Sequence, residues 1–192
     1  MAEIAELYVF LHCDIEHSEQ IIYTMSKELT IEDIQGIVAK DESRYLELKQ
    51  STGELYKAMT SACAFLNTDG GWVMFGITPK LKIVGQNVTD PTRQEIANAL
   101  RKFEPAIDIP VQYVEIPEKE GFYVIAMYFN PPAPTQAPYT FDARPYYKVE
   151  NTTAIMPREM FEERIRESNT GMFRWEKLEC QIPSEETDRD RI

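Results

Sequence analysis

Residues 64–77 decide the fold of this chain, and they read AFLNTDGGWVMFGI. The first three residues end a predicted helix that begins near Glu54 and buries a stripe of apolar side chains at helical spacing. Residues 67–71 are small and polar, and they predict a tight turn. The continuous apolar run from Trp72 to Ile77 predicts a strand that is buried on both faces of a sheet. This succession predicts helices packed on a sheet.

A second strand is predicted shortly before this helix, because the apolar residues begin to alternate at Arg44. One face of the strand carries Arg44, Leu46 and Leu48, and the other carries Tyr45, Glu47 and Lys49. Successive side chains of a strand point to opposite faces. The acid Glu47 and the base Lys49 are therefore expected on the same side of the sheet.

The rest of the chain alternates helix and strand signals. A helix is predicted after Thr30, where Asp33 completes a capping-box-like pair, and another begins at Asp90, just before Pro91. Residues 1–24 also show helical spacing. The other expected elements are strands at 81–84, 109–116 and 122–129, an exposed proline-rich loop at 131–138, a strand at 146–149, a turn at 151–153 and a helix at 157–167. Together they predict a compact α/β (α+β) domain with a mixed, mostly antiparallel sheet and packed helices.

The net charge of −12 is concentrated at the two ends of the sequence. Residues 1–42 hold ten acidic and two basic side chains and carry −8, and residues 176–192 hold six and three and carry −3. The central stretch, 43–175, carries only −1. A near-neutral centre leaves room for the local basic patch that a nucleic acid needs, without itself predicting one.

Composition indicates an intracellular globular protein. Hydrophobic residues make up 43% of the chain and charged residues 27%. No apolar run approaches the roughly 18 residues of a membrane span, and no Lys or Arg precedes Lys27 to begin a secretion signal. The cysteines Cys13, Cys63 and Cys180 form neither a disulfide framework nor a CxxC pair. We therefore expect reduced thiols, a cytoplasmic location and no membrane partner.

Five segments resemble the Schlafen AlbA-type domain family, and they follow one another in the family's order. The segments are Glu42–Lys49, Ala64–Gly71 with Phe75-Gly76-Ile77, Ile83-Val84-Gly85, Pro145–Thr153 and Pro157-Arg158-Glu159. The first resembles the family's E-S-x-x-hydrophobic-E-F-K opening, and the fourth resembles its Y-x-R-x-G segment. The likeness spans about residues 30–168.

The resemblance implies three regions: a helical N-terminal extension at 1–29, a Schlafen AlbA-type domain at 30–168 and a C-terminal connector at 169–192. In many bacterial relatives the domain is followed by an ATPase-like or winged-helix region, and the proteins are labelled transcriptional regulators. The resemblance also suggests Met25 as an alternative start, which the intact mass of the native protein would test.

The resemblance further implies a candidate catalytic site. In eukaryotic Schlafen nucleases, residues that match Glu42, Glu47 and Lys49 help to build a metal-dependent site that cleaves RNA. Carboxylates hold Mg²⁺ or Mn²⁺, which activates water and stabilises the charge that develops on phosphate. The family's further acid is replaced here by Thr78 and Pro79. Glu42 and Glu47 alone leave a divalent ion poorly compensated, and an ordinary ion pair between Glu47 and Lys49 is the competing interpretation.

The turn is a second candidate, as a phosphate or ligand site formed by Asn67, Thr68, Asp69, Gly70 and Gly71. Glycines let the backbone approach a ligand closely, and backbone amides can receive a phosphate. The residues alone favour an ordinary helix-to-strand turn, whose Asn and Asp satisfy the backbone. The resemblance raises the importance of the turn without fixing its role.

The candidate nucleic-acid-binding residues are Lys49, Lys80, Lys82, Arg144 and Lys148. Arg144 and Lys148 bracket two tyrosines, and cations beside aromatics suit a surface that follows a nucleic-acid backbone and stacks its bases. Scattered surface bases more often serve solvation. The resemblance favours Lys148, which matches the family's usual arginine in this late strand.

The sequence thus favours a nucleic-acid-binding module, for DNA or RNA, of a transcriptional regulator. The first alternative is a Schlafen-like metal-dependent endoribonuclease, the only reading that requires Mg²⁺ or Mn²⁺; otherwise no cofactor is expected. The second alternative is a protein-interaction or oligomerisation domain, and a homodimer is compatible with it.

Overall fold

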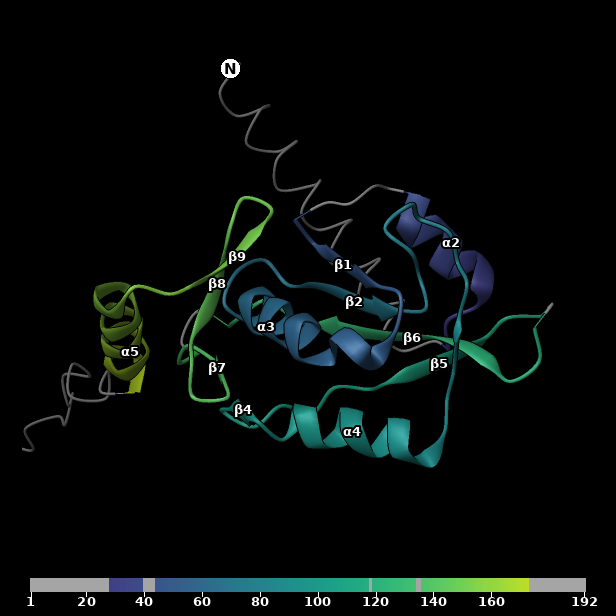
Figure 1. Cartoon of the computed structure of the whole chain (residues 1–192). Helices are drawn as coiled ribbons and strands as arrows, with labels where there is room; N and C mark the ends of the chain where they lie inside the picture. Colours follow the sequence, from purple (N-terminus) through teal and green to yellow (C-terminus); the bar gives the residue numbers. More distant parts are fainter. Residues whose placement is uncertain (1–27, 40–43, 118, 134–135, 173–192) are drawn as a thin grey trace, which may run out of the picture.

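The computed structural model describes residues 28–39, 44–117, 119–133 and 136–172 (Figure 1). The helix expected within residues 1–24, the residue Glu42 and the connector after residue 172 lie outside the described ranges. Among the residues that the structure describes, no helix is long and apolar enough to cross a membrane.

The described chain alternates helices and short strands, as the sequence predicts. The helices are α2 (Ile31–Ala39), α3 (Leu55–Leu66), α4 (Asp90–Leu100) and α5 (Arg158–Met172), and a 3-10 helix at Thr52–Glu54 precedes α3. The strands are β1 (Leu46–Lys49), β2 (Gly71–Phe75), β3 (Gln86–Asn87), β4 (Phe103–Glu104), β5 (Gln112–Glu115), β6 (Phe122–Phe129), β7 (Thr140–Phe141), β8 (Tyr146–Val149) and β9 (Thr152–Ile155).

A five-stranded mixed sheet forms the centre of the domain. Its strands run in the order β1-β2-β6-β3, and β5 also pairs with β6. β1 is parallel to β2, whereas β2, β3 and β5 are all antiparallel to β6. Two small antiparallel pairs, β4 with β7 and β8 with β9, lie outside this sheet. The predicted α+β fold with a mostly antiparallel sheet is confirmed.

Helices cover both faces of the sheet, because β2 and β6 are apolar on both sides. On one face, α3 and α4 pack against Val73, Phe75 and Met127 in the larger core. On the other face, α2 packs its buried residues Ile34 and Val38 against a second cluster that includes Leu46, Leu48 and Met74. The β8–β9 hairpin and α5 lie beside these layers, at the end where α3 finishes (Figure 1).

The predicted helix starts are confirmed by their hydrogen bonds. At α2, the backbone amide of Thr30 donates to Asp33 Oδ2, at 2.8 Å, and the amide of Asp33 donates to Thr30 Oγ1. At α4, Thr89 is the capping residue and forms a reciprocal capping box with Thr92. These side chains satisfy amides that have no partner within the helix.

Several predicted boundaries are wrong, for local backbone reasons. The strand expected at 81–84 is only a bridge between Ile77 and Ile83, because Leu81 adopts a φ of 59° within a turn. The pairing strand is instead β3, further along the chain. The turn expected at 151–153 is shifted, since Glu150 takes a φ of 53° and the chain pairs again from Thr152.

Two elements differ in length from the prediction. The strand expected at 109–116 is confined to Gln112–Glu115, after a proline at 110 that has no amide to donate to a ladder. The last helix continues to Met172 rather than ending near residue 167. The described part of the proline-rich loop, 131–133 and 136–138, contains no helix or strand, as expected.

Candidate nucleic-acid interface

Strand β1 presents a polar face on the α3 side of the sheet. Leu46 and Leu48 are each 9% exposed and belong to the core on the α2 side. The alternate residues of the strand, Glu47 and Lys49, therefore point to the opposite side. β1 pairs with β2 and ends the strand order of the sheet, so this face lies at an edge. The predicted alternation at this strand is confirmed.

Three charged side chains meet on this face, and we name them the lysine cluster: Glu47, Lys49 and Lys148. Lys49 Nζ lies 2.7 Å from Glu47 Oε1, and Lys148 Nζ lies 3.9 Å from Glu47 Oε2. The side chains of Glu47 and Lys49 are each 18% exposed, whereas that of Lys148 is only 5% exposed. Two ammonium groups thus face one carboxylate, and the cluster carries one net positive charge.

Lys148 is the most enclosed member of the cluster. Its Nζ lies 4.8 Å from the centroid of the Phe65 ring on α3, within the range of a cation–π contact. Burial lowers the pKa of Lys148 below its ordinary value; the Glu47 carboxylate opposes this shift and Lys49 adds to it. The carboxylate that Lys148 shares with Lys49 is thus the neighbouring group that favours its charged form.

The β8–β9 hairpin that carries Lys148 is held against α3 by polar contacts. Ser61 Oγ on α3 and Thr153 Oγ1 on β9 are 3.1 Å apart. Asn67 Nδ2, at the end of α3, donates to the carbonyl oxygen of Tyr146 at 2.8 Å. Thr153 pairs directly with Lys148 across the hairpin. These contacts fix the strand that delivers Lys148 to Glu47.

Asn67 has a structural role that the sequence did not reveal. Its side chain is 2% exposed; besides the bond to Tyr146, its Nδ2 donates to the Tyr139 carbonyl and its Oδ1 accepts from the Tyr139 amide, both at 2.8 Å. The amide side chain thus joins α3 to the segment that leads into β7 and β8. The expected pattern, in which Asn satisfies backbone groups, is present across the fold rather than within its own turn.

The glycines of the turn are required by close packing. Gly70 has a φ of 75°, and a Cβ there would lie 2.8 Å from the Phe129 carbonyl oxygen. A Cβ on Gly71 would lie 2.7 Å from the Tyr45 carbonyl oxygen and 2.8 Å from the Phe65 ring. The amides of Thr68 and Gly70 donate to the Phe65 carbonyl. Much of the turn is therefore engaged within the protein, and its phosphate-binding role stays a prediction.

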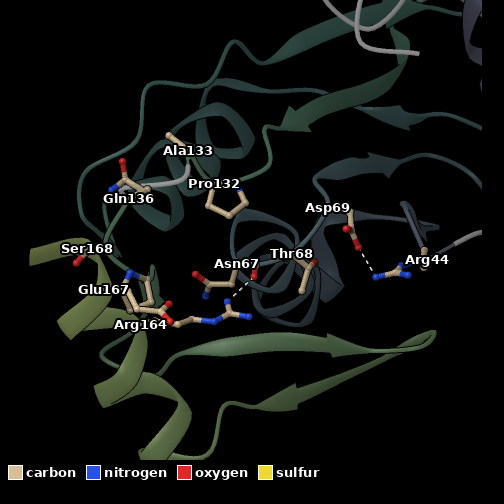
Figure 2. A pocket seen from close by; sticks show the side chains of 11 residues that line it. Arg44, Asn67, Thr68, Asp69, Pro132, Ala133, Gln136, Arg164, Glu167 and Ser168 are labelled. Atoms are coloured by element: carbon tan, nitrogen blue, oxygen red, sulfur yellow. Dashed lines mark hydrogen bonds and ion pairs between the residues drawn. The ribbon is translucent and has the colours of Figure 1, made fainter. Parts of the chain in front are cut away.

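A pocket of about 420 Å³ lies beside this turn (Figure 2). It is lined by Arg44, Asn67, Thr68, Asp69, Pro132, Ala133, Gln136, Pro138, Arg164, Glu167 and Ser168. Arg44 pairs with Asp69, and Arg164 Nη1 on α5 donates to the Asn67 carbonyl oxygen at 2.6 Å. Figure 2 shows these two arginines on either side of the turn. The pocket lining holds two arginines and two acids, Asp69 and Glu167, so its formal charges cancel. An anion is therefore attracted more strongly to the lysine cluster than to this pocket.

The other predicted basic residues lie apart from the lysine cluster. Lys80 and Lys82 are exposed in the turn that follows β2, where the Thr78 amide donates to the Lys82 carbonyl oxygen. Arg144 is exposed in the turn between β7 and β8. Of the five basic residues predicted to bind nucleic acid, Lys49 and Lys148 belong to the lysine cluster, and the other three do not. Sequence reasoning missed Arg44 and Arg164, whose partners are remote in the sequence and unmarked by any local motif.

The proposed nuclease residues are only partly placed. Glu42 lies outside the described residues. Thr78 stands at the position of the further acid, and its Oγ1 accepts a hydrogen bond from the Lys82 amide at 3.2 Å. Within the described ranges, no three His, Cys, Asp or Glu side chains are grouped so that they could hold a metal ion. Glu47 is the described carboxylate of the expected metal pair, and both of its oxygens face ammonium groups.

Cys63 is a packing residue in the described structure. It is fully buried on α3, and its Sγ lies 3.4 Å from the Tyr139 carbonyl oxygen. Burial raises the pKa of the thiol to about 12, so the reactive thiolate is scarce at neutral pH. The side chain therefore acts as a small core residue.

Comparisons with known proteins identify the family of this chain. A family model described as Schlafen, AlbA_2 matches residues 42–157, more than half of the chain. The chain belongs to this Schlafen AlbA_2 family, which is broadly associated with nucleic acids. A comparison with curated proteins gave no match.

Solved structures with a similar chain also exist, and 21 chains match. One is the DIP2311 protein from Corynebacterium diphtheriae, which is 19% identical and has a TM-score of 0.47. The match covers 79% of this chain and 29% of that chain. The present chain therefore spans less than a third of that protein.

Proposed function

We propose that this domain binds nucleic acid through its phosphate backbone, with the lysine cluster as the principal contact. The observation that carries the proposal is the sharing of one carboxylate by Lys49 and Lys148. The surplus positive charge can be satisfied by a phosphate oxygen, which accepts strong hydrogen bonds from ammonium groups. Lys49 is the more exposed lysine and would contact the phosphate directly. Lys148 would contribute through its positive charge beside Glu47.

Backbone contacts position a protein on nucleic acid but carry little sequence information. A cluster of two lysines and one carboxylate has no planar donor pair to read the edge of a base, as arginine or asparagine would. We therefore propose binding with little base specificity. The strongly acidic ends of the chain would repel nucleic acid, so we expect a modest affinity that falls steeply with salt.

Binding is a better match to the cluster than cleavage. Both oxygens of Glu47 face ammonium groups, which compete with a divalent ion for the same lone pairs. Thr78, in place of an acid, offers a neutral oxygen that already accepts a hydrogen bond. A metal-assisted reaction needs carboxylates that compensate the charge of the metal. We therefore keep the endoribonuclease as the second candidate, dependent on Glu42.

We further propose that the domain serves within a transcriptional regulator in the cytoplasm. The family membership and the resemblance to the front of bacterial regulators support this role. A cytoplasmic location is consistent with Cys63, whose thiol is kept reduced there. The role would be tested by whether deletion of the gene region for residues 30–168 changes transcript levels while the rest of the protein is still made.

The proposal is tested by a binding titration with the full-length chain. Fluorescence anisotropy of a dye-labelled oligonucleotide, at about 50 mM salt, should show binding that weakens as salt is raised. Replacing Lys49 or Lys148 by Ala should weaken binding by about tenfold, because each removes a charged hydrogen-bond partner. Lys80→Ala should have a smaller effect, and Lys102→Ala, in the exposed turn after α4, is the matched control. Absence of binding at low salt would defeat the proposal.

A further inference from the structure

The pocket beside the turn is built by three separate parts of the chain (Figure 2). Asn67 and Thr68 contribute the turn, α5 contributes one wall, and the proline-rich loop contributes another. The pocket volume of about 420 Å³ lies within the roughly 300 to 1,000 Å³ of sites that hold small molecules. The pocket therefore has room for a ligand of the size of a nucleotide.

Arg164 on α5 brings a cation without an acidic partner to this pocket. The residue is half-buried, and its one polar contact with the described residues is the bond from Nη1 to the Asn67 carbonyl oxygen (Figure 2). Arg44 differs, because its guanidinium pairs with Asp69. A guanidinium carries five N–H donors, so Arg164 retains donors for a second oxygen ligand. A phosphate or a carboxylate group matches these donors.

The rest of the lining restricts the ligand further. The carboxylates of Asp69 and Glu167 disfavour a ligand that is only anionic. A carboxylate offers about four acceptor sites, so Asp69 can accept from a ligand while it pairs with Arg44. The amino groups of nucleic-acid bases are suitable donors. Pro132 and Pro138 add apolar surface against which a flat ring can pack.

We propose that this pocket binds one unpaired nucleotide, with its phosphate on Arg164 and its base against Pro132 and Pro138. The site goes beyond the proposed function, because no residue of the lysine cluster lines the pocket. In a duplex the face of a base is covered by its neighbours in the stack. The ligand is therefore a free mononucleotide or an unpaired nucleotide within a strand, and both present a phosphate and an accessible base.

Isothermal titration calorimetry of the full-length chain with each of the four nucleoside monophosphates tests the inference. At least one nucleotide should bind, and inorganic phosphate or the matching nucleoside should bind at least about tenfold more weakly, because each lacks part of the contacts. Arg164→Gln keeps an N–H donor for the Asn67 carbonyl oxygen but removes the charge, and it should weaken nucleotide binding by about 10- to 100-fold. Arg166→Gln is the matched control, since Arg166 is exposed on the same helix and does not line the pocket.

NMR spectra of the wild-type protein give a second readout that does not depend on a variant folding. The nucleotide should shift the amide signals of Thr68 and Ser168 and the Nε signal of Arg164. Shifts confined to the lysine cluster would overturn the inference and leave phosphate binding standing. The inference is also overturned if no nucleotide binds at about 1 mM, if Arg164→Gln binds as the wild type does, or if free glycine binds as tightly as the nucleotide.

Two hairpin oligonucleotides, one fully paired and one with a single unpaired nucleotide, distinguish the sources of the ligand. Competition with the mononucleotide by the second hairpin alone identifies a strand as the source. Absence of competition identifies the free nucleotide, and each result supports the pocket. If the mononucleotide binds and neither hairpin binds at low salt, this inference stands and the proposed function fails.

Discussion

The Nζ atom of Lys148 lies 3.9 Å from Glu47 Oε2, although the two residues belong to strands of different sheets. Glu47 is on the edge strand β1, and Lys148 is on the β8–β9 hairpin. Helix α3 contacts both strands, and the ring of its Phe65 lies 4.8 Å from Lys148 Nζ. The lysine cluster is therefore a product of tertiary packing. It forms only when the β8–β9 hairpin is packed against α3.

Replacing Glu47 by Gln should strengthen nucleic-acid binding. The change removes the negative charge of the cluster and leaves both ammonium groups available to phosphate, so we expect an affinity several times higher at low salt. Anisotropy titrations of the wild type and the variant measure this directly. The same samples, incubated with structured RNA and Mg²⁺ or Mn²⁺, address the nuclease alternative. Cleavage by the wild type that is lost in the variant, together with weaker binding, would contradict the binding account.

Lys148 should make the stability of the domain increase at alkaline pH. Burial lowers its pKa in the folded state below the ordinary value of 10.5. Between the lowered pKa and 10.5 the unfolded chain binds more protons, so raising the pH favours the folded state. Below that window the cost of burying the charge is fully present and constant. Relative to Lys148→Met, the wild type should therefore gain stability as the pH rises towards 10.5.

Urea unfolding of the wild type and Lys148→Met at a series of pH values up to 10.5 measures this difference in the free energy of unfolding. Lys102→Met is the control, and its free energy of unfolding should change with pH as that of the wild type does. Parallel curves for the wild type and Lys148→Met would show that Lys148 is not buried as a charged group.

Asn67 should matter for stability rather than for ligand binding. Asn67→Ala removes three hydrogen bonds to the backbone of Tyr139 and Tyr146 and leaves those groups buried. We expect a loss of about 2 to 4 kcal/mol in the free energy of unfolding. Chemical denaturation measures it, with Asn98→Ala, on the exposed side of α4, as the control. A loss below about 0.5 kcal/mol would mean that the side chain does not join α3 to the β8 segment.

Two glycine substitutions should have opposite effects on stability. Gly71→Ala brings a Cβ to within 2.7 Å of the Tyr45 carbonyl oxygen, and we expect a loss of about 1 to 3 kcal/mol. Gly36→Ala, within α2, adds a Cβ with nothing within 4 Å, and we expect a gain of about 0.5 to 1 kcal/mol. Thermal unfolding of the two variants measures both. A stabilising Gly71→Ala would contradict the close packing of Gly71 against the Tyr45 carbonyl oxygen.

The sequence predicted the fold wherever the hydrophobic pattern was strong. The strand Phe122–Phe129 has the predicted bounds. Its eight consecutive apolar residues favour a strand that is buried on both faces of the sheet. The weak elements failed where a residue other than glycine takes a positive φ. Leu81 and Glu150 do so, and neither residue type signals a left-handed backbone. Those two positions displaced a predicted strand and a predicted turn.

The candidate site was predictable only along one strand. The period of two placed Glu47 and Lys49 on one face, and the structure confirms this. The approach of Lys148 could not be obtained from spacing, because it depends on how the β8–β9 hairpin packs on α3. The local sequence pattern therefore predicts which residues share one face of a strand. The residues from other elements that contact this face are determined by tertiary packing.

The salt dependence of binding tests the central claim most directly. Each phosphate that a protein neutralises makes the plot of log affinity against log salt steeper by slightly less than one unit. The wild type and the double variant Lys49→Ala/Lys148→Ala should therefore differ in slope by about one, with Lys102→Ala matching the wild type. A shallower slope in the double variant is the predicted result. An unchanged slope, with affinity retained, would contradict the account.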